Sequence, residues 1–346
     1  MIVDERIRLL FPRMLGFIVI SAAAGAVYGY VTSIATDPRG PIRGTLTGLL
    51  IGAALVSLNN FVLRAPLARL SRAPFMVSVA VRSLIYLVVF VVALAVGQFL
   101  VPDHPPARPV MLADVLFCFA VTFVIVSLAE VNSLLGQNVL LSFVTGRYHR
   151  PQVEQRVFLI MDMKGSTAAA ERLGEVDFHR LVNRVVTDLS APIALRGGQI
   201  HKYVGDELIA TWPLARGLKD ATCVRACFDA RDRLVAHGAD YKRDFAAVAQ
   251  VRASLHCGPV VVGEMGSVKK EIALLGDTLN TAARLVDACR DSGESIIASA
   301  DLLDRLVLPP GIAARPLGRI QLRGKKQAIG LFALGEATSD VRLEAQ

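Results

Sequence analysis

The chain has 346 residues, 53% of them hydrophobic, and a formal net charge of +8 at pH 7. This length accommodates two modules of ordinary size. No basic run is interleaved with aromatic residues, so we expect no nucleic-acid binding. None of the five cysteines forms a Cys-x-x-Cys pair, and we therefore expect reduced, packed thiols.

The first part of the chain contains most of the apolar runs. Four stretches are long enough to cross a bilayer as helices, near residues 14–35, 42–63, 76–101 and 110–135. A cleaved signal peptide does not fit, because the first run is long and is followed by further spans. The sequence therefore predicts an all-α transmembrane domain of about four helices over residues 1–136. Arg82 interrupts the third run and keeps the alternative of buried core helices open.

The distribution of arginine predicts the orientation of these spans. Arginines concentrate in the N-terminal tail, in the loop between the second and third stretches, and after the fourth stretch. They are Arg6, Arg8, Arg13, Arg64, Arg69, Arg72, Arg147 and Arg150. By the positive-inside rule both termini lie in the cytoplasm, and the same arginines suit an anionic inner leaflet. We expect a multi-pass protein of the inner (plasma) membrane with the lipid bilayer as a partner.

Three ionisable residues lie in or near the spans, and such residues are functional candidates. They are Arg82, Asp114 and Glu130. A pairing of Arg82 with one of the two acids is one hypothesis, although Glu130 fits an interfacial charge equally well. The outer loops are too short for a binding domain. The membrane domain therefore has either an unidentified ligand, such as a lipid or a small apolar molecule, or a purely anchoring role.

A connector over residues 137–152 has apolar residues at helical spacing, followed by Gly146 and Pro151 as stop signals. It fits a signalling helix that leaves the membrane, or a passive tether. Residues 153–340 then form a globular domain. Its expected elements are a strand at 156–161, a helix at 177–195, a hairpin of 199–204 and 208–212, a helix at 218–237, strands at 251–256 and 260–264, a helix at 280–289, a strand at 295–298, and a last pair at 320–323 and 329–333. Strand, helix, hairpin, helix, strand is the order of a ferredoxin-like α+β sandwich.

Three short segments of this domain contain the candidate catalytic and metal-binding residues. Asp162 ends a buried strand, and Asp206 lies in the tight turn of the hairpin. Asn280 and Arg284 are four residues apart, which places them on one face of a helix. Two carboxylates that share metal ions, with separate amide and cationic groups, suit an anionic, metal-bound substrate. A nucleoside triphosphate is the obvious candidate.

These segments, in this order, resemble the catalytic domain of class III adenylyl and guanylyl cyclases of the membrane-anchored bacterial type. The resemblance covers roughly residues 153–335 and implies their ferredoxin-like α+β fold. It implies that Asp162 and Asp206 bind two Mg²⁺ or Mn²⁺ ions per site. It also implies that Asn280 orients the ribose and that Arg284 stabilises charge on the phosphorus under attack.

The resemblance assigns further residues to the substrate. The backbone N–H groups of Gly165, Ser166 and Thr167 suit phosphate oxygens at a helix start, although Ser166 also fits a helix N-cap. Lys202 occupies the position at which ATP-using members have a lysine that reads adenine. Lys325 resembles the lysine that holds the terminal phosphates, with Lys326 and Arg323 as neighbouring alternatives.

One position departs from the family pattern. Seven residues before Asn280 the family usually has Asp, Thr or Ser, which accepts a hydrogen bond from the adenine amino group, and here that residue is Ala273. Losing one polar contact to the base weakens purine discrimination by about 1–3 kcal/mol. A backbone carbonyl or Glu271 can substitute for the missing side chain.

The sequence therefore predicts a membrane-bound adenylate cyclase that converts ATP to cyclic AMP and pyrophosphate. In the family the sites are shared between two protomers, so a homodimer is the economical interpretation. Two alternatives stay open: a guanylate cyclase that uses GTP, and a catalytically weak sensor or scaffold. A diguanylate cyclase is disfavoured, because such enzymes lack the Asn280-x-x-x-Arg284 pair.

Overall fold

In the computed structural model of the protein, the described residues are 2–33, 38–58, 75–101, 123, 127, 131, 142–143, 145–321 and 328–337. The chain divides into two compact units, Met1–Leu135 and Gly136–Gln346.

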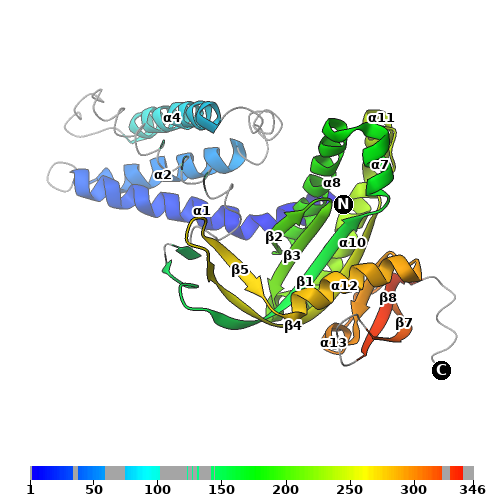
Figure 1. Cartoon of the computed structure of the whole chain (residues 1–346). Helices are drawn as coiled ribbons and strands as arrows, with labels where there is room; N and C mark the ends of the chain where they lie inside the picture. The colour runs from blue at the N-terminus through cyan, green and yellow to red at the C-terminus, as the bar shows by residue number, and fades with distance from the viewer. Residues whose placement is uncertain are drawn as a thin grey trace. The chain divides into compact units, whose positions relative to one another are not determined.

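The first unit contains three described helices, α1 (Ile2–Ser33), α2 (Gly40–Ser57) and α4 (Phe75–Leu100) (Figure 1). Glycines repeat every four residues along α2, and those facing α1 allow the two backbones to touch. A Cβ atom added to Gly44 would lie 2.0 Å from the carbonyl oxygen of Gly25, and one on Gly25 would lie 2.1 Å from that of Gly44. Small residues at helix contacts are typical of membrane helix pairs, where packing rather than hydrophobic burial holds helices together.

Two of the described helices, Gly40–Ser57 and Met76–Gly97, are long and apolar enough to cross a membrane. The apolar segment of α1, Ile18–Val31, is shorter. Several large apolar side chains of the unit point outward, with Ile20 69% and Phe99 83% exposed. The fourth predicted span lies outside the described residues except for three single positions, as do the acidic partners considered for Arg82. Two apolar helices are a weak indication of membrane insertion.

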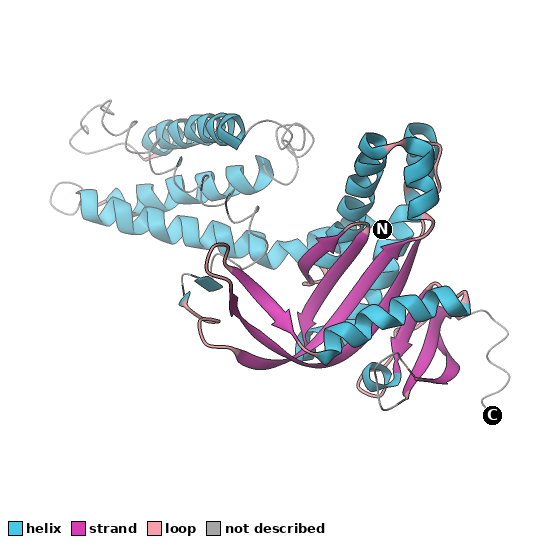
Figure 2. Cartoon of the chain, viewed as in Figure 1, coloured by secondary structure: helices cyan, strands magenta, loops and turns pink. Residues whose placement is uncertain are grey.

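The second unit is built on one eight-stranded sheet with the order β2-β3-β1-β4-β6-β8-β7, and β5 pairs with β4 (Figure 2). Its elements, in chain order, are β1 (Gln152–Met163), α7 (Ser166–Leu173), α8 (Glu175–Leu195), β2 (Gln199–Val204), β3 (Glu207–Pro213), α9 (Leu214–Leu218), η2 (Lys219–Ala221), α10 (Thr222–Ala236), α11 (Gly238–Phe245), β4 (Val251–Met265), β5 (Glu271–Leu275), α12 (Asp277–Ser292), β6 (Ile296–Ser299), α13 (Ala300–Leu303), β7 (Ile312–Ile320) and β8 (Ile329–Glu336).

The strands β2, β3, β1 and β4 with the helices α8 and α10 form a ferredoxin-like core. All three strand pairs in this part are antiparallel. Side chains alternate along β1, because successive residues of a strand point to opposite faces. Leu159 and Met161 join the core cluster that includes α8 and α10, whereas Phe158 and Ile160 pack with α12 on the other face. The predicted α+β fold is confirmed, and Asp162 follows Ile160 on the face of α12.

Some element boundaries differ from the predicted ones. The two strands expected on either side of Gly258 are one strand, β4, because Pro259 stays in register with Gln155 of β1. The helix expected from residue 218 begins at Thr222, since Asp220 and Ala221 have φ angles of 52° and 49° and interrupt it. Strand β5 was not predicted, and the strand expected at 320–323 is β7, which ends at Ile320.

The segment that leads into β1 is packed into the second unit. Tyr148 is 6% exposed and belongs to the same cluster as Phe158 and Val262. Its hydroxyl donates a hydrogen bond to Glu154 Oε1 at 2.9 Å, and its carbonyl accepts one from the N–H of Glu264 at 2.9 Å. Residues of two strands, β1 and β4, therefore anchor this segment.

The cysteines of the second unit are free and buried, as predicted. They are Cys223, Cys227, Cys257 and Cys289. Burial raises the pKa of Cys223 and of Cys289 to about 12, so both thiols stay protonated and unreactive at neutral pH.

Candidate active site

Two predicted carboxylates meet at one edge of the ferredoxin-like core. Asp162 lies near the end of β1, directly opposite Glu207 of β3. Asp206 precedes Glu207 in the turn after β2, and this turn uses the left-handed conformation of Gly205, with φ of 62°. Burial raises the pKa of Asp162, and the negative charge of Asp206 raises it further, against the opposing effect of two arginines. The two carboxylates are therefore close enough to repel each other.

The carboxylate of Asp206 is incompletely satisfied. Its Oδ2 atom is buried and has no hydrogen-bond partner among the described residues. Leaving such an atom unpaired costs about 1–3 kcal/mol, and more for a charged group. An unpaired, buried carboxylate oxygen beside a second carboxylate is a position at which a cation is stabilising.

Three further charged residues surround the two carboxylates, and sequence reasoning did not identify them. The guanidinium nitrogens of Arg252 and Arg290 lie 3.7 and 3.8 Å from Asp162 Oδ2. Burial, followed by the charges of Asp162 and Asp206, raises the pKa of Glu207 to about 6. The two-residue turn of the hairpin pairs Glu207 with Val204 of β2, whereas its position opposite Asp162 depends on the pairing of β3 with β1. The arginines require knowledge of the tertiary fold.

The carboxylates fit oxygen-preferring divalent ions such as Mg²⁺ or Mn²⁺. Within the part of the chain that the structure describes, no group of three His, Cys, Asp or Glu side chains is arranged to hold a metal ion by itself. Mg²⁺ is usually held by one or two carboxylates together with substrate phosphates and water. Asp162 and Asp206 match that requirement, with the unpaired Oδ2 atom of Asp206 as the supporting observation.

The turn after β1 begins the helix α7. Gly165 is its N-cap in the left-handed conformation, with φ of 70°, and no side chain caps the helix. Ser166 is the first helical residue and Thr167 the second, so Ser166 does not serve as the N-cap. The backbone N–H groups of this first turn are directed out of the helix N-terminus, which suits phosphate oxygens.

Lys202 lies on β2 next to a bulge. Ile200 pairs with Ala210 and Lys202 pairs with Ile209, so His201 is an extra residue in β2. The Lys202 Nζ atom lies 3.1 Å from Glu271 Oε1 on β5. Ala273, two residues after Glu271, pairs with Gly263 and is 5% exposed. The structure thus places a carboxylate, although not from residue 273, beside the lysine.

Asn280 and Arg284 lie on one face of α12, as their spacing predicts. Asn280 is exposed and Arg284 half-buried, while the neighbouring residues Thr281 and Leu285 are buried. No hydrogen bond or ion pair joins either side chain to another described residue. Both are therefore available to a ligand or to a second protein chain.

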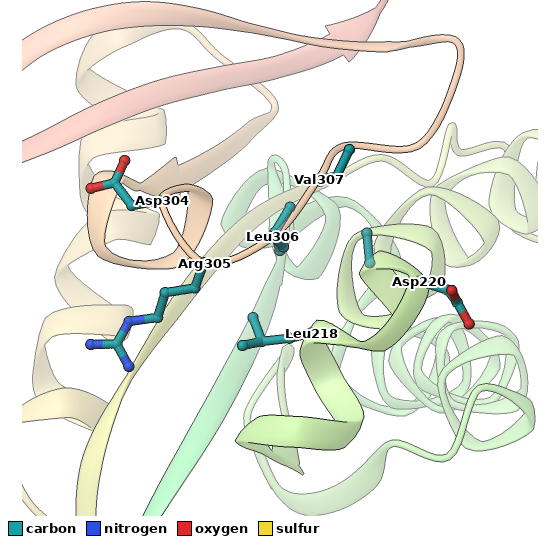
Figure 3. Close-up of a pocket in the computed structure, with 7 residues that line it drawn as sticks. Leu218, Asp220, Asp304, Arg305, Leu306 and Val307 are labelled. Atoms are coloured by element: carbon teal, nitrogen blue, oxygen red, sulfur yellow. The ribbon is translucent and has the colours of Figure 1, made fainter.

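One predicted site residue, Lys325, falls outside the described residues, as do all of residues 322–327. A pocket of about 530 Å³ is lined by residues of η2 and by the loop after α13, among them Asp220 and Arg305 (Figure 3). It contains none of the predicted site residues.

Comparisons with known proteins identify the family of the chain. The sequence model of the family described as the adenylate and guanylate cyclase catalytic domain matches residues 150–335, more than half of the chain. Adenylate cyclase 2 of Rhizobium meliloti (strain 1021) is 37% identical over 219 residues, which are 63% of this chain and 60% of that protein. The adenylate cyclase of Anabaena cylindrica is 24% identical over 181 residues, 50% of this chain and 35% of that protein. The chain thus spans less than two thirds of the length of these relatives.

The fold agrees with that of a solved structure. The chain is similar to a bacterial light-regulated adenylyl cyclase with a TM-score of 0.55 and 20% sequence identity, over 67% of each chain. This similarity concerns the fold, whereas the family match rests on sequence. The chain belongs to the family of adenylate and guanylate cyclases, with the catalytic domain of that family in residues 150–335.

Proposed function

We propose that this protein is a membrane-bound adenylate cyclase, which forms 3′,5′-cyclic AMP and pyrophosphate from ATP and is active as a homodimer with shared sites. The single observation that supports the chemistry best is the pair of adjacent carboxylates, Asp162 and Asp206, one of whose buried oxygens has no hydrogen-bond partner among the described residues. Buried carboxylates that repel each other are costly unless a cation or ligand offsets them, and such clusters are typical of functional sites.

Each site residue has a separate role in the proposed reaction. Asp162 and Asp206 would hold two Mg²⁺ or Mn²⁺ ions, which lower the pKa of the ribose 3′-hydroxyl and neutralise the triphosphate. The N–H groups at the start of α7, from Gly165 to Thr167, bind phosphate oxygens. Asn280 orients the ribose, and Arg284 stabilises the charge that develops on the α-phosphate during in-line attack. We assign the terminal phosphates to Lys325.

ATP is the proposed substrate rather than GTP. The family includes enzymes of both specificities, so membership alone does not select the base. Lys202 supports ATP, because an ammonium group donates hydrogen bonds only and the N1 atom of adenine is an acceptor. The names of the relatives, which are adenylate cyclases, support the same choice.

The dimer and the membrane location are part of the proposal. Asn280 and Arg284 make no hydrogen bond or ion pair within the described part of the chain, which suits residues that complete a site on a second protomer. The apolar helices α2 and α4, the glycine contacts between α1 and α2, and the arginine distribution support a multi-pass inner-membrane protein with the catalytic domain in the cytoplasm.

The direct test is product formation by the purified full-length protein, with ATP and GTP offered separately in Mn²⁺ and in Mg²⁺. We expect cyclic AMP from ATP, and no product from Asp162→Ala or Asp206→Ala. Asp177→Ala serves as the control, because that carboxylate is exposed on α8 and pairs only with Arg180. Turnover retained in either of the first two variants would contradict the metal assignment, and cyclic GMP as the main product would favour the guanylate cyclase.

A further inference from the structure

The purine site of this chain lacks a polar side chain where its family has one. Ala273 has only a methyl group, which accepts no hydrogen bond. It is also 5% exposed and lies opposite Gly263 in the β4–β5 ladder. The exocyclic group of a base therefore needs another partner, and the nearest candidates are the side chains on the same face of β5.

Glu271 is on that face. Residues two apart in a strand point to the same side, so Glu271 and Ala273 share one face of β5. The Glu271 Oε1 atom lies 3.1 Å from Lys202 Nζ, although the two residues are 69 positions apart in the chain. Lys202 is on the edge strand β2 and Glu271 is on β5, with the three strands β3, β1 and β4 between them. The contact therefore depends on the curvature of the sheet, which brings β5 toward β2.

The buried cluster on the α12 face shows which side of each strand faces that helix. It contains Ile209 of β3, Phe158 of β1, Val262 of β4 and Leu274 of β5. Because side chains alternate along a strand, Glu271 and Ala273 point to the face of β5 opposite to Leu274. Lys202 pairs with Ile209 because of the extra residue His201 in β2, and this bulge puts Lys202 on the same side as the cluster. The contact between Lys202 and Glu271 therefore requires that the bend of the sheet turn the other face of β5 toward β2.

The side chains of Lys202 and Glu271 are accessible, and the Glu271 carboxylate is ionised. Lys202 is 45% and Glu271 31% exposed, so solvent and a ligand reach both. The hydrogen bond and the charge of Lys202 lower the pKa of Glu271, so its carboxylate is ionised and accepts hydrogen bonds only. Burial, followed by the charge of Lys202, lowers the pKa of the adjacent His201 to about 4, so this imidazole adds no charge at neutral pH.

A donor beside an acceptor is the pattern that the Watson–Crick edge of a purine requires. Adenine presents a donor at its 6-amino group and an acceptor at N1. Guanine presents the reverse, an acceptor at O6 and a donor at N1, with a second donor at its 2-amino group. A carboxylate at the 6-position with an ammonium at N1 selects adenine, and the exchanged order selects guanine.

We propose that Glu271 is a specificity-determining residue of this cyclase, which accepts the hydrogen bond of the adenine 6-amino group while Lys202 donates to N1. This assignment rests on the proposed adenylate cyclase function. It replaces the missing contact at Ala273 by a carboxylate from the same face of the same strand. An exposed ion pair contributes at most about 1 kcal/mol, so a base that inserts between the two groups loses little.

The test compares kcat/KM for ATP and for GTP in the full-length protein. Glu271→Gln keeps the size of the side chain but offers a neutral amide, and we expect the ATP:GTP ratio to fall about 10- to 100-fold, as for the loss of one charged hydrogen bond. Ala273→Thr in the Glu271→Gln background restores an acceptor at the family position and is expected to recover much of that ratio. Exchange of the charges, Lys202→Glu with Glu271→Lys, is expected to favour GTP.

The control is Glu264→Gln, because Glu264 lies on the same hairpin and pairs with Lys270 and His149 instead. We expect this variant to keep the parental ratio. A role for Glu271 that only holds β5 against β2 would lower the rates with both nucleotides and leave their ratio unchanged. A ratio within about twofold of the parent in Glu271→Gln, or an equal change in Glu264→Gln, overturns the proposal.

A binding measurement separates this proposal from the proposed function. Each nucleotide raises the unfolding temperature according to its affinity, whether or not it turns over. If the unmodified chain forms no cyclic nucleotide, the adenylate cyclase assignment fails. The difference between the thermal shifts with ATP and GTP then tests Glu271 alone, and an unchanged difference in Glu271→Gln refutes it.

Discussion

Asp188→Asn tests what holds the helices α8, α10 and α11 together on one side of the catalytic sheet. The Asp188 side chain is buried in α8. Its Oδ2 atom accepts hydrogen bonds from the Tyr241 hydroxyl and from His237 Nδ1, each at 2.8 Å, and its Oδ1 atom accepts one from Arg233 Nε at 3.2 Å. Both oxygens are thus engaged by donors on two other elements.

The expected loss follows from this geometry. An asparagine amide has one acceptor oxygen, so its NH₂ group must face at least one of the three donors. The substitution removes the charge from a buried, hydrogen-bonded carboxylate and creates a donor–donor contact. Together these changes lower the free energy of unfolding by about 3 kcal/mol. For a domain of this size, that corresponds to a fall of about 6–12 °C in the unfolding temperature.

The effect should also depend on pH. Burial raises the pKa of Asp188, but the hydrogen bonds from His237 and Tyr241 outweigh it, and the pKa in the folded protein is lower than usual. A lowered pKa contributes stability above the ordinary pKa of aspartate and loses it as the pH falls through the lowered value. The difference between the parent and Asp188→Asn should therefore narrow as the pH falls below about 4.5.

The fluorescence of Trp212 provides the assay. It is the only tryptophan of the chain and is fully buried in β3, so it reports the unfolding of the catalytic unit in the full-length protein. Asp177→Asn on the same helix is the matched control, because Asp177 and its partner Arg180 are both exposed and such pairs contribute about 0–1 kcal/mol. The reasoning is refuted if Asp188→Asn unfolds at the temperature of this control, or if its deficit persists unchanged in acid.

Three further predictions concern the site and the first unit. Asp206→Asn should raise the unfolding temperature without divalent ions, because it removes the repulsion between the Asp162 and Asp206 carboxylates. The same variant should lose its stabilisation by Mn²⁺, and stabilisation equal to that of the parent contradicts the metal site. Mixed Asp162→Ala and Arg284→Ala chains should regain part of the activity, since one of two composite sites would be intact, and confirmed mixed dimers without activity argue against shared sites. Gly44→Val should make the first unit more sensitive to protease than the control Gly16→Val. A Cβ atom at Gly44 would meet the backbone of Gly25, whereas one at Gly16 would meet nothing within 4 Å. Equal protease sensitivity of the two variants contradicts the packing of α1 against α2.

Local sequence patterns predicted the residues that end strands and turns. The run Val157–Met161 is apolar throughout because both faces of β1 are buried, and this placed Asp162 correctly at the end of a strand. The apolar stretches around Gly205 predicted the hairpin that presents Asp206. The spacing of Asn280 and Arg284 predicted a common helix face, although α12 begins three residues earlier than expected.

Sequence patterns did not predict the contacts between strands that are distant in the chain. Strand β5 has only five residues and is defined by its ladder with β4, so periodicity did not reveal it. The contact between Lys202 and Glu271 requires a one-residue bulge and a curved sheet, neither of which leaves a signal in composition. Likewise, the approach of Arg290 to Asp162 depends on how α12 packs on the sheet.

The packing of Tyr148 determines where a catalytic fragment can begin. A polypeptide that starts at β1 would lack this ring and leave a cavity against Phe158 and Val262, of the kind that costs about 3–5 kcal/mol when a large aromatic side chain is removed. It would also leave the N–H of Glu264 without its acceptor and the Oε1 atom of Glu154 without its donor, while Arg156 still donates to Oε2. For expression in isolation, the first residue of the fragment should therefore lie upstream of Gly146, so that the turn preceding Tyr148 is retained.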